Sequence, residues 1–133
     1  MLLGIYTPTI FLKLETINRI VLMTEQWCED NIGRNHKKKF ITLYVRNQKF
    51  GESPCYGQYD CDNSAIHIYT NRCENIKEII RCVLHEYTHH LQPIENKYEK
   101  LLKKYGYDNH PMEIEAGKNE EYYLNVWNYI KSN

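Results

Sequence analysis

The five residues His85-Glu86-Tyr87-Thr88-His89 combine two histidines and a glutamate at a spacing that suits metal-dependent hydrolysis. On an α-helix, residues four apart lie one turn above each other on the same face, so both imidazoles can bind one ion. The glutamate between them can reach the open coordination position, where a water would bind. The motif therefore predicts a zinc site of hydrolytic type with Glu86 as its catalytic residue.

The motif lies within a stretch whose apolar residues recur at helical spacing. Asn75 is suited to cap a helix here, with Glu78 returning the bond, and a proline just after Gln92 should end it. The apolar stripe of this helix consists of Ile76, Ile79, Ile80, Val83, Leu84, Tyr87 and Leu91. His85 and His89 lie toward one edge of the stripe, where a ligand can be held rigidly and still face a cleft.

Two histidines do not complete a zinc site, so a third protein ligand must come from elsewhere in the chain. The segment 107–118 offers carboxylates and an imidazole, and Pro111 suits the first position of a new helix there. These residue types leave three candidates open: Glu113, Glu115 and His110.

The motif and the sequence Glu-Ile-Glu-Ala at positions 113–116 resemble the gluzincin metallopeptidases. The resemblance is to the minimal single-domain gluzincins and to related peptidases of phages and mobile elements. In that family the metal-binding glutamate commonly lies three residues before a small residue, which corresponds to Glu113 before Ala116. The resemblance implies that His85, His89 and Glu113 bind one zinc ion.

One position departs from the family pattern. Four residues after the ligand glutamate, related enzymes often carry Asp or Asn, which orients a zinc-bound imidazole, whereas this chain has Gly117. Glu120, seven positions after Glu113, is the candidate substitute. The alternative is that Glu120 is an ordinary surface glutamate and that nothing takes this role.

The chemistry that these residues imply is peptide hydrolysis. Zinc lowers the pKa of a bound water from 15.7 toward roughly 7. Glu86 would take the proton of that water and pass it to the leaving amine. A further donor usually stabilises the tetrahedral oxyanion. The side chains near the third-ligand segment that suit this role are Tyr105, Tyr107, His110, Tyr122 and Tyr123, and the sequence selects none of them.

The rest of the chain predicts an α+β domain of zincin type that spans residues 1–133. Helical periodicity over 12–31 predicts an N-terminal helix, and β-branched and aromatic residues predict a strand over 40–45. Segments 56–60 and 65–70 flank a turn and predict a hairpin. Two further helices are expected after the metal helix. The resemblance implies that the strand over 65–70 forms the edge of the substrate cleft.

The last segment, 120–130, carries Tyr123, Trp127 and Ile130 on one helical stripe. This pattern predicts that the segment packs on the domain. In some minimal gluzincins a terminal segment blocks the cleft, so a latent enzyme is a second expectation.

The composition and net charge of the chain limit the kinds of molecule that it is expected to bind. Seventeen basic and seventeen acidic side chains cancel, so no global field favours nucleic acid or an anionic membrane. No apolar stretch suffices to cross a bilayer, and the features of a signal peptide are missing.

The five cysteines include no Cys-x-x-Cys pair and are expected to be reduced. In an oxidising compartment, Cys55 and Cys61 could instead form a disulfide. We expect a soluble, cytoplasmic enzyme that acts on a peptide or protein substrate.

Two other interpretations stay open. An SprT-like protease would use His110 as its third ligand, because His110-x-x-Glu113 echoes that family, although the chain lacks a basic surface and a zinc ribbon. A zinc-binding regulatory module without catalytic activity is a different class, for which Gly117 and the short chain leave room. Metal content and peptidase activity separate the three interpretations.

Overall fold

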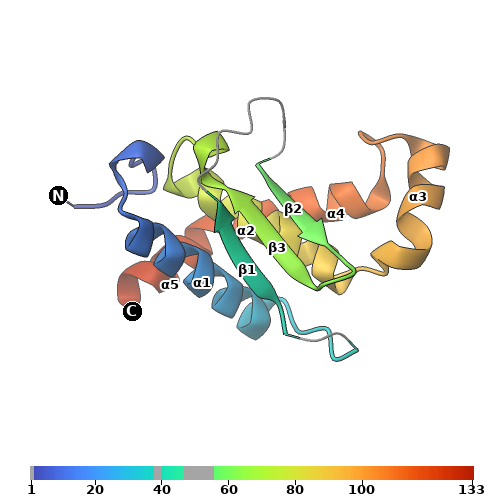
Figure 1. Ribbon diagram of the computed structural model, residues 1–133, viewed down its shortest axis with the longest axis horizontal. Helices are drawn as coiled ribbons and strands as arrows, with labels where there is room; N and C mark the ends of the chain where they lie inside the picture. Colours follow the sequence, from blue (N-terminus) through green and yellow to red (C-terminus); the bar gives the residue numbers. More distant parts are fainter. Residues whose placement is uncertain (1, 38–39, 47–55) are drawn as a thin grey trace.

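Helices and a small mixed sheet make up the computed structural model, which describes residues 2–37, 40–46 and 56–133 (Figure 1). The elements in chain order are α1 (Leu14–Asn31), β1 (Thr42–Arg46), β2 (Gly57–Asp60), β3 (Ala65–Tyr69), α2 (Ile76–Leu91), α3 (Ile94–Tyr105), α4 (Pro111–Asn119) and α5 (Tyr123–Ser132). Three 3-10 turns, η1 (Thr9–Phe11), η2 (Thr70–Arg72) and η3 (Glu120–Tyr122), lie between them or before α1. The expected α+β class is confirmed. The pairing considered for Cys55 and Cys61 lies outside the described residues, because Cys55 is not among them.

The sheet has the strand order β1-β3-β2, with β1 parallel and β2 antiparallel to β3. The hairpin predicted from segments 56–60 and 65–70 is therefore present as β2 and β3. β3 is the central strand, and its Ile66 and Ile68 are fully buried. Because β1 and β2 use the backbone hydrogen bonds on both sides of β3, the expectation that this strand forms an open cleft edge is wrong. Within the described residues β2 pairs only with β3, so β2 has an open edge.

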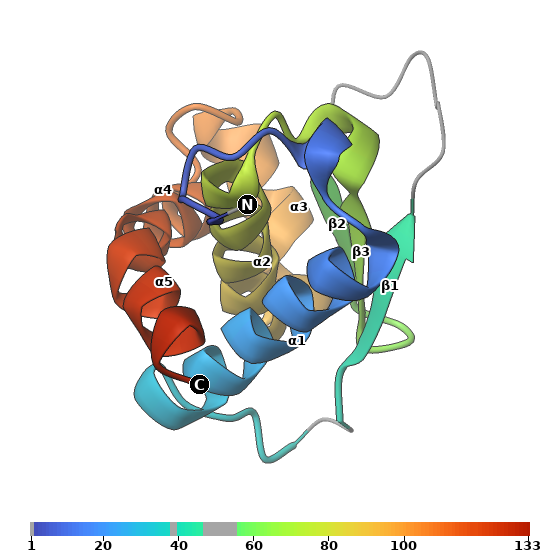
Figure 2. The ribbon, with the colours of Figure 1, turned by 90° about the vertical axis from the view of Figure 1, so that its left-hand side faces the viewer.

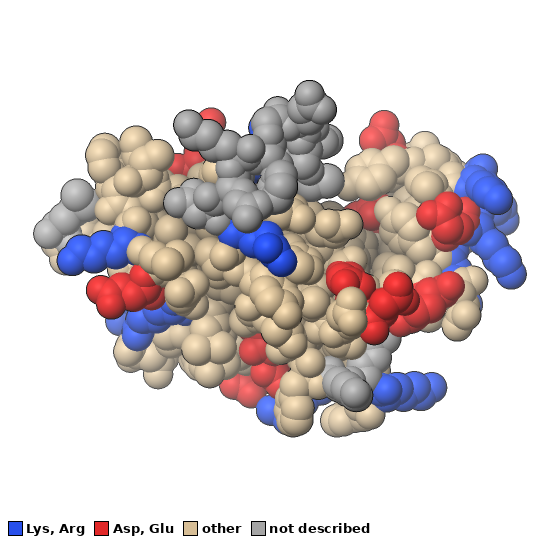
Figure 3. Space-filling view, viewed as in Figure 1, with Lys and Arg blue, Asp and Glu red and all other residues tan. Residues whose placement is uncertain are grey.

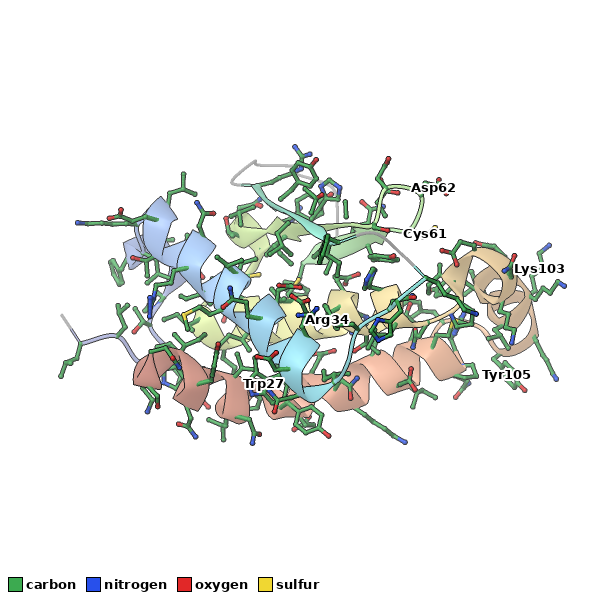
Figure 4. The ribbon with its side chains drawn as sticks, turned by 90° about the horizontal axis from the view of Figure 1, so that it is seen from below. Trp27, Arg34, Cys61, Asp62, Lys103 and Tyr105 are labelled. Atoms are coloured by element: carbon green, nitrogen blue, oxygen red, sulfur yellow. The ribbon has the colours of Figure 1, made fainter. Side chains whose placement is uncertain are left out.

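The helices lie on one side of the sheet, as the turned view in Figure 2 shows. α1 and α2 pack against each other and against the strands, and α5 packs on α1 and α2. The stripe predicted for the first helix is buried, including Ile20, Val21 and Cys28. Tyr122 and Trp27 join this layer, with ring centroids 5.5 Å apart. Figure 4 shows the labelled Trp27 between α1 and the C-terminal helices.

The helix that carries the motif is the central element of the core. Its buried apolar side chains are Ile76, Ile79, Ile80, Val83, Leu84 and Tyr87. Each such burial contributes roughly 1.5–3 kcal/mol. The predicted cap is present, since Asn75 Oδ1 accepts a hydrogen bond from the Glu78 amide at 3.0 Å. The Glu78 carboxylate accepts from the amide of Glu74, one residue before the expected partner Asn75. The cap and the buried side chains thus fix α2 in the core, and its last two turns carry the motif.

Three helices follow α2 in place of the two expected. α3 was not predicted: it has partly buried Leu101 and Leu102 but no fully buried residue. Its Lys-rich outer side gives the basic end of the molecule in Figure 3, while acidic side chains gather beside it. The predicted packing of the last segment is confirmed, because Val126, Trp127 and Ile130 of α5 are buried. In the described part of the chain, no helix has both the length and the apolar character needed to span a membrane.

Candidate metal centre

His85, His89 and Glu113 meet where α2 lies beside α4. The Nε2 atom of His85 is 2.9 Å from Oε1 of Glu113, and the Nε2 atom of His89 is 3.1 Å from the same oxygen. The ligand atoms of the three residues all lie within 4.8 Å of one another, so the group could hold a metal ion. Two imidazole nitrogens and one carboxylate oxygen form a donor set that zinc accepts in sites with three protein ligands. The structure thus brings together the three ligands expected from the sequence.

Helix geometry and one close packing contact position these side chains. The rings of His85 and His89 are one turn apart on α2, with centroids separated by 4.9 Å. α4 packs against α2, and Ala116 of α4 is fully buried. The Asn119 side-chain amide donates to Thr88 Oγ1 at 2.9 Å and ties the end of α4 to α2.

The second nitrogen of each histidine also has a partner. His85 Nδ1 lies 2.8 Å from Oε2 of Glu120, and His89 Nδ1 lies 2.7 Å from Oε1 of Gln92. Such contacts fix the tautomer and ring orientation of metal-binding histidines, which leaves Nε2 for the ion. Glu120 takes this position from the 3-10 turn η3, after α4 has ended. It is therefore not an ordinary surface glutamate, and it makes the kind of contact to His85 for which it was the candidate.

Gln92 was not singled out from the sequence. It is the C-cap residue of α2 and is 6% exposed. Its amide nitrogen donates to the carbonyl oxygen of Met112 at 3.0 Å and to Oε1 of Glu115 at 2.7 Å. The polar atoms of Gln92 therefore join His89 to α4. Glu115, one of the three candidate ligands, accepts the hydrogen bond from Gln92 and is not part of the cluster of His85, His89 and Glu113.

His110 is also excluded as a ligand by its contacts. Its Nδ1 accepts a hydrogen bond from the Met112 amide at 3.1 Å and so caps α4. This leaves the proton on Nε2, which is 3.0 Å from the carbonyl oxygen of Tyr98. His110 is fully buried and both ring nitrogens are in use. The interpretation that made His110 the third ligand is not supported by this geometry.

Tyr98 on α3 is the second residue that sequence reasoning missed. Its hydroxyl donates to Oε2 of Glu113, whereas the contacts with the two histidines are made by Oε1. Its ring lies 4.1 Å from the His110 ring and 6.2 Å from the His89 ring, measured between centroids. No signal in the sequence pointed to it, because α3 itself was not predicted.

The electrostatics of the cluster favour paired charges. Burial opposes the charge on His85, but hydrogen bonds to Glu113 and Glu120 outweigh it and raise the pKa of His85 to about 10. Burial likewise opposes ionisation of Glu113, yet hydrogen bonds from His85, His89 and Tyr98 hold its pKa well below the ordinary value. In the metal-free protein the ionised carboxylate of Glu113 thus favours the protonated forms of both histidines, and a metal ion bound at Nε2 would displace those protons.

Glu86 lies beside the cluster on the wall of a cleft of about 710 Å³. The cleft is lined by Tyr56, Gly57, Glu78, Arg81, Cys82, His85, Glu86, Tyr107 and Glu120. Glu86 is 9% exposed, and burial raises the pKa of its carboxyl group. Among the residues that the structure describes, none forms a hydrogen bond with this carboxylate. Glu120, the first residue of the last segment, lines the cleft, whereas no residue of α5 does. The expectation that this segment makes the enzyme latent stays a prediction.

β2 lies directly against the motif helix. A Cβ atom on Gly57 would be 2.5 Å from Cys82 Sγ and 3.3 Å from Glu86 Cγ. Glycine is therefore required sterically at this point, where the edge strand meets the wall that carries Glu86. This close contact was not foreseen from the sequence.

Of the five candidate oxyanion donors, only Tyr107 lines the cleft. Tyr122 packs on Trp27, and Tyr123 lies 4.7 Å from the Lys77 ammonium group. Tyr105 is 42% exposed on the outer end of α3, where Figure 4 labels it. Two other histidines lie apart from the cluster: His90 contacts Tyr59, and His67 stacks on Tyr44.

Comparison with known proteins adds no further information about the site. No family model, no curated protein and no solved structure matches this chain. The assignment of the candidate metal centre therefore rests on its geometry and on the chemistry of its residues.

Proposed function

We propose that this protein is a zinc-dependent metallopeptidase of gluzincin type. The observation that supports this proposal is the cluster of His85 Nε2, His89 Nε2 and Glu113 Oε1 beside a cleft whose wall carries Glu86. An imidazole–imidazole–carboxylate set with an adjacent glutamate is the arrangement that metal-assisted hydrolysis needs.

Each residue has a distinct part in the proposed reaction. His85, His89 and Glu113 would hold the ion, and Glu120 and Gln92 would keep the two imidazoles oriented. When bound, zinc supplies a water whose pKa is lowered toward roughly 7 and polarises the substrate carbonyl. Glu86 would accept a proton from the attacking water and deliver it to the leaving amine. Its raised pKa favours this role, because a general base works best with a pKa nearer the operating pH.

The open edge of β2 suits an extended peptide substrate. Gly57 and Tyr56 line the cleft, and β2 has no strand partner except β3 within the described residues. A peptide can add to such an edge by backbone hydrogen bonds. We therefore propose that β2, in place of the strand over 65–70, binds the substrate backbone.

The test combines metal content with hydrolysis of a denatured protein substrate. The wild-type protein should contain about one zinc ion and hydrolyse the substrate. Glu86→Gln should retain zinc and lose about a hundred- to ten-thousandfold in rate, the usual contribution of general acid–base catalysis. Glu113→Ala should lose the metal, and the exposed Glu121→Gln should change neither property.

Two outcomes would contradict the proposal. A wild-type protein that takes up no zinc would remove the metal centre. Hydrolysis that is unaffected by Glu86→Gln would remove the proposed base. Zinc binding without any hydrolysis would instead favour a regulatory zinc-binding module.

A further inference from the structure

α3 reaches the candidate metal centre through one side chain. The helix has no fully buried residue, yet the hydroxyl of its Tyr98 donates to Oε2 of Glu113. The other carboxylate oxygen, Oε1, faces Nε2 of both histidines at 2.9 and 3.1 Å. The two oxygens of Glu113 therefore have different partners, and Tyr98 occupies one of them.

We propose that Tyr98 is a positioning residue that restricts Glu113 to a single ligating oxygen, an inference that rests on the proposed function. A carboxylate can bind a metal ion through one oxygen or through both. With Oε2 engaged by the tyrosine hydroxyl, only Oε1 is directed at the two imidazole nitrogens. This restriction keeps a coordination position open, which a catalytic zinc site requires for water or substrate.

Tyr98 is itself held by the helix that carries Glu113. His110 Nε2 is 3.0 Å from the Tyr98 carbonyl oxygen, and the two rings lie 4.1 Å apart. His110 is fixed in turn as the N-cap of α4, three residues before Glu113. The start of α4 thus orders both the carboxylate and the tyrosine that restrains it. This explains why a fully buried histidine stands at position 110 without being a ligand.

The position of Tyr98 separates this role from a direct part in catalysis. Tyr98 is not among the side chains that line the cleft, whereas Tyr107 is. The hydroxyl of Tyr98 contacts Oε2 of Glu113, the carboxylate oxygen that makes no hydrogen bond with His85 or His89. Its effect on the reaction would therefore pass through Glu113 and not through contact with substrate.

The variant Tyr98→Phe tests the inference, because it keeps the ring on His110 and removes only the hydroxyl. Tyr105→Phe on the same helix is the matched control, since Tyr105 is exposed at its outer end. Zinc affinity, measured by competition with a chelator, should fall about 10- to 100-fold in Tyr98→Phe, as is usual when a residue supporting a ligand is lost. Tyr105→Phe should bind zinc like the wild type.

Cobalt substitution gives a readout that a merely structural role would not change. Visible absorption of Co²⁺ weakens when a fifth ligand atom is added to a four-coordinate ion. The Co²⁺ form of Tyr98→Phe should absorb less strongly than the Co²⁺ forms of wild type and Tyr105→Phe, because Oε2 becomes free to bind. Far-UV circular dichroism of the metal-free proteins checks that the fold is retained, as expected for a helix without fully buried residues.

The outcomes separate this inference from the proposed function. If wild type binds metal and Tyr98→Phe has the same affinity and the same Co²⁺ spectrum, the role of Tyr98 is wrong and the proposed function stands. A lower zinc affinity with an unchanged Co²⁺ spectrum would also overturn the single-oxygen role. If wild type binds neither metal, the proposed function fails and the role of Tyr98 fails with it.

Discussion

His85 Nδ1 lies 2.8 Å from Oε2 of Glu120, so the first histidine of the motif contacts a residue 35 positions further along the chain. The other oxygen of Glu120 accepts a hydrogen bond from Arg81 Nε at 3.1 Å. Arg81 precedes His85 by one helical turn on α2. The carboxylate is therefore held from two points of the motif helix, and it contacts His85 where Gly117 has no side chain to do so.

Replacing Glu120 should weaken metal binding without removing a ligand. Glu120→Ala is expected to reduce zinc affinity about 10- to 100-fold, because His85 loses the acceptor that fixes its ring. Glu120→Gln keeps an acceptor oxygen and should lose less. The neighbouring, exposed Glu121→Ala is the control. Titration of each metal-free protein with zinc against a chelator measures the effect, and equal affinities for all four proteins would contradict the orienting role.

Gly57 should not tolerate even a methyl group. The Cβ of Gly57→Ala would be 2.5 Å from Cys82 Sγ and 2.9 Å from the carbonyl oxygen of His67. The carbonyl oxygen of His67 is a backbone atom and cannot move easily, so we expect β2 to shift away from α2. The free energy of unfolding should fall by about 1–3 kcal/mol, as is typical of overpacking. Urea denaturation measures this loss.

Gly117→Ala is the matched control for that prediction. Nothing lies within 4 Å of a Cβ at position 117, which is inside α4. Alanine in a helix is favoured over glycine by roughly 0.5–1 kcal/mol, so this variant should be more stable than wild type. A Gly57→Ala protein as stable as Gly117→Ala would show that the packing of β2 on α2 is looser than described.

Glu25 should make the stability depend on pH, independently of the metal centre. Burial, followed by the hydrogen bond with Glu29 and its charge, raises the pKa of Glu25 from 4.5 to about 8. Between these values the folded protein keeps a proton that the unfolded chain releases. Stability should therefore fall as pH rises from about 4.5 to 8, by at most about 1.4 kcal/mol per pH unit.

Urea denaturation of the metal-free protein across this range tests the prediction. Glu25→Gln removes the ionisation and should have a smaller loss of stability between pH 5 and pH 8, whereas the exposed Glu15→Gln should follow wild type. The same pH dependence in wild type and Glu25→Gln would assign the effect to another group.

Local sequence determined the motif helix and its neighbours. The Asn75 cap, the apolar stripe of α2 and the i, i+4 pair of His85 and His89 depend on residues at most a few positions apart, where helix geometry dictates the result. The hairpin β2–β3 and the burial pattern of α1 are likewise short-range features. Glu113 could be expected only through a resemblance, because the sequence alone left Glu115 and His110 as equal candidates.

Tertiary structure decided which groups surround the ligands. Glu120, Gln92 and Tyr98 reach the site because α4, η3 and α3 pack at particular angles on the end of α2, and no spacing in the sequence encodes those angles. The central place of β3, which moves the open edge to β2, likewise follows from a parallel pairing with β1 across a long connection. The sequence by itself determined that two histidines lie on one face of a helix with a glutamate beside them. Packing brought Glu113 to these histidines and placed the hydrogen bonds to all three side chains, because those contacts join segments that are distant along the chain.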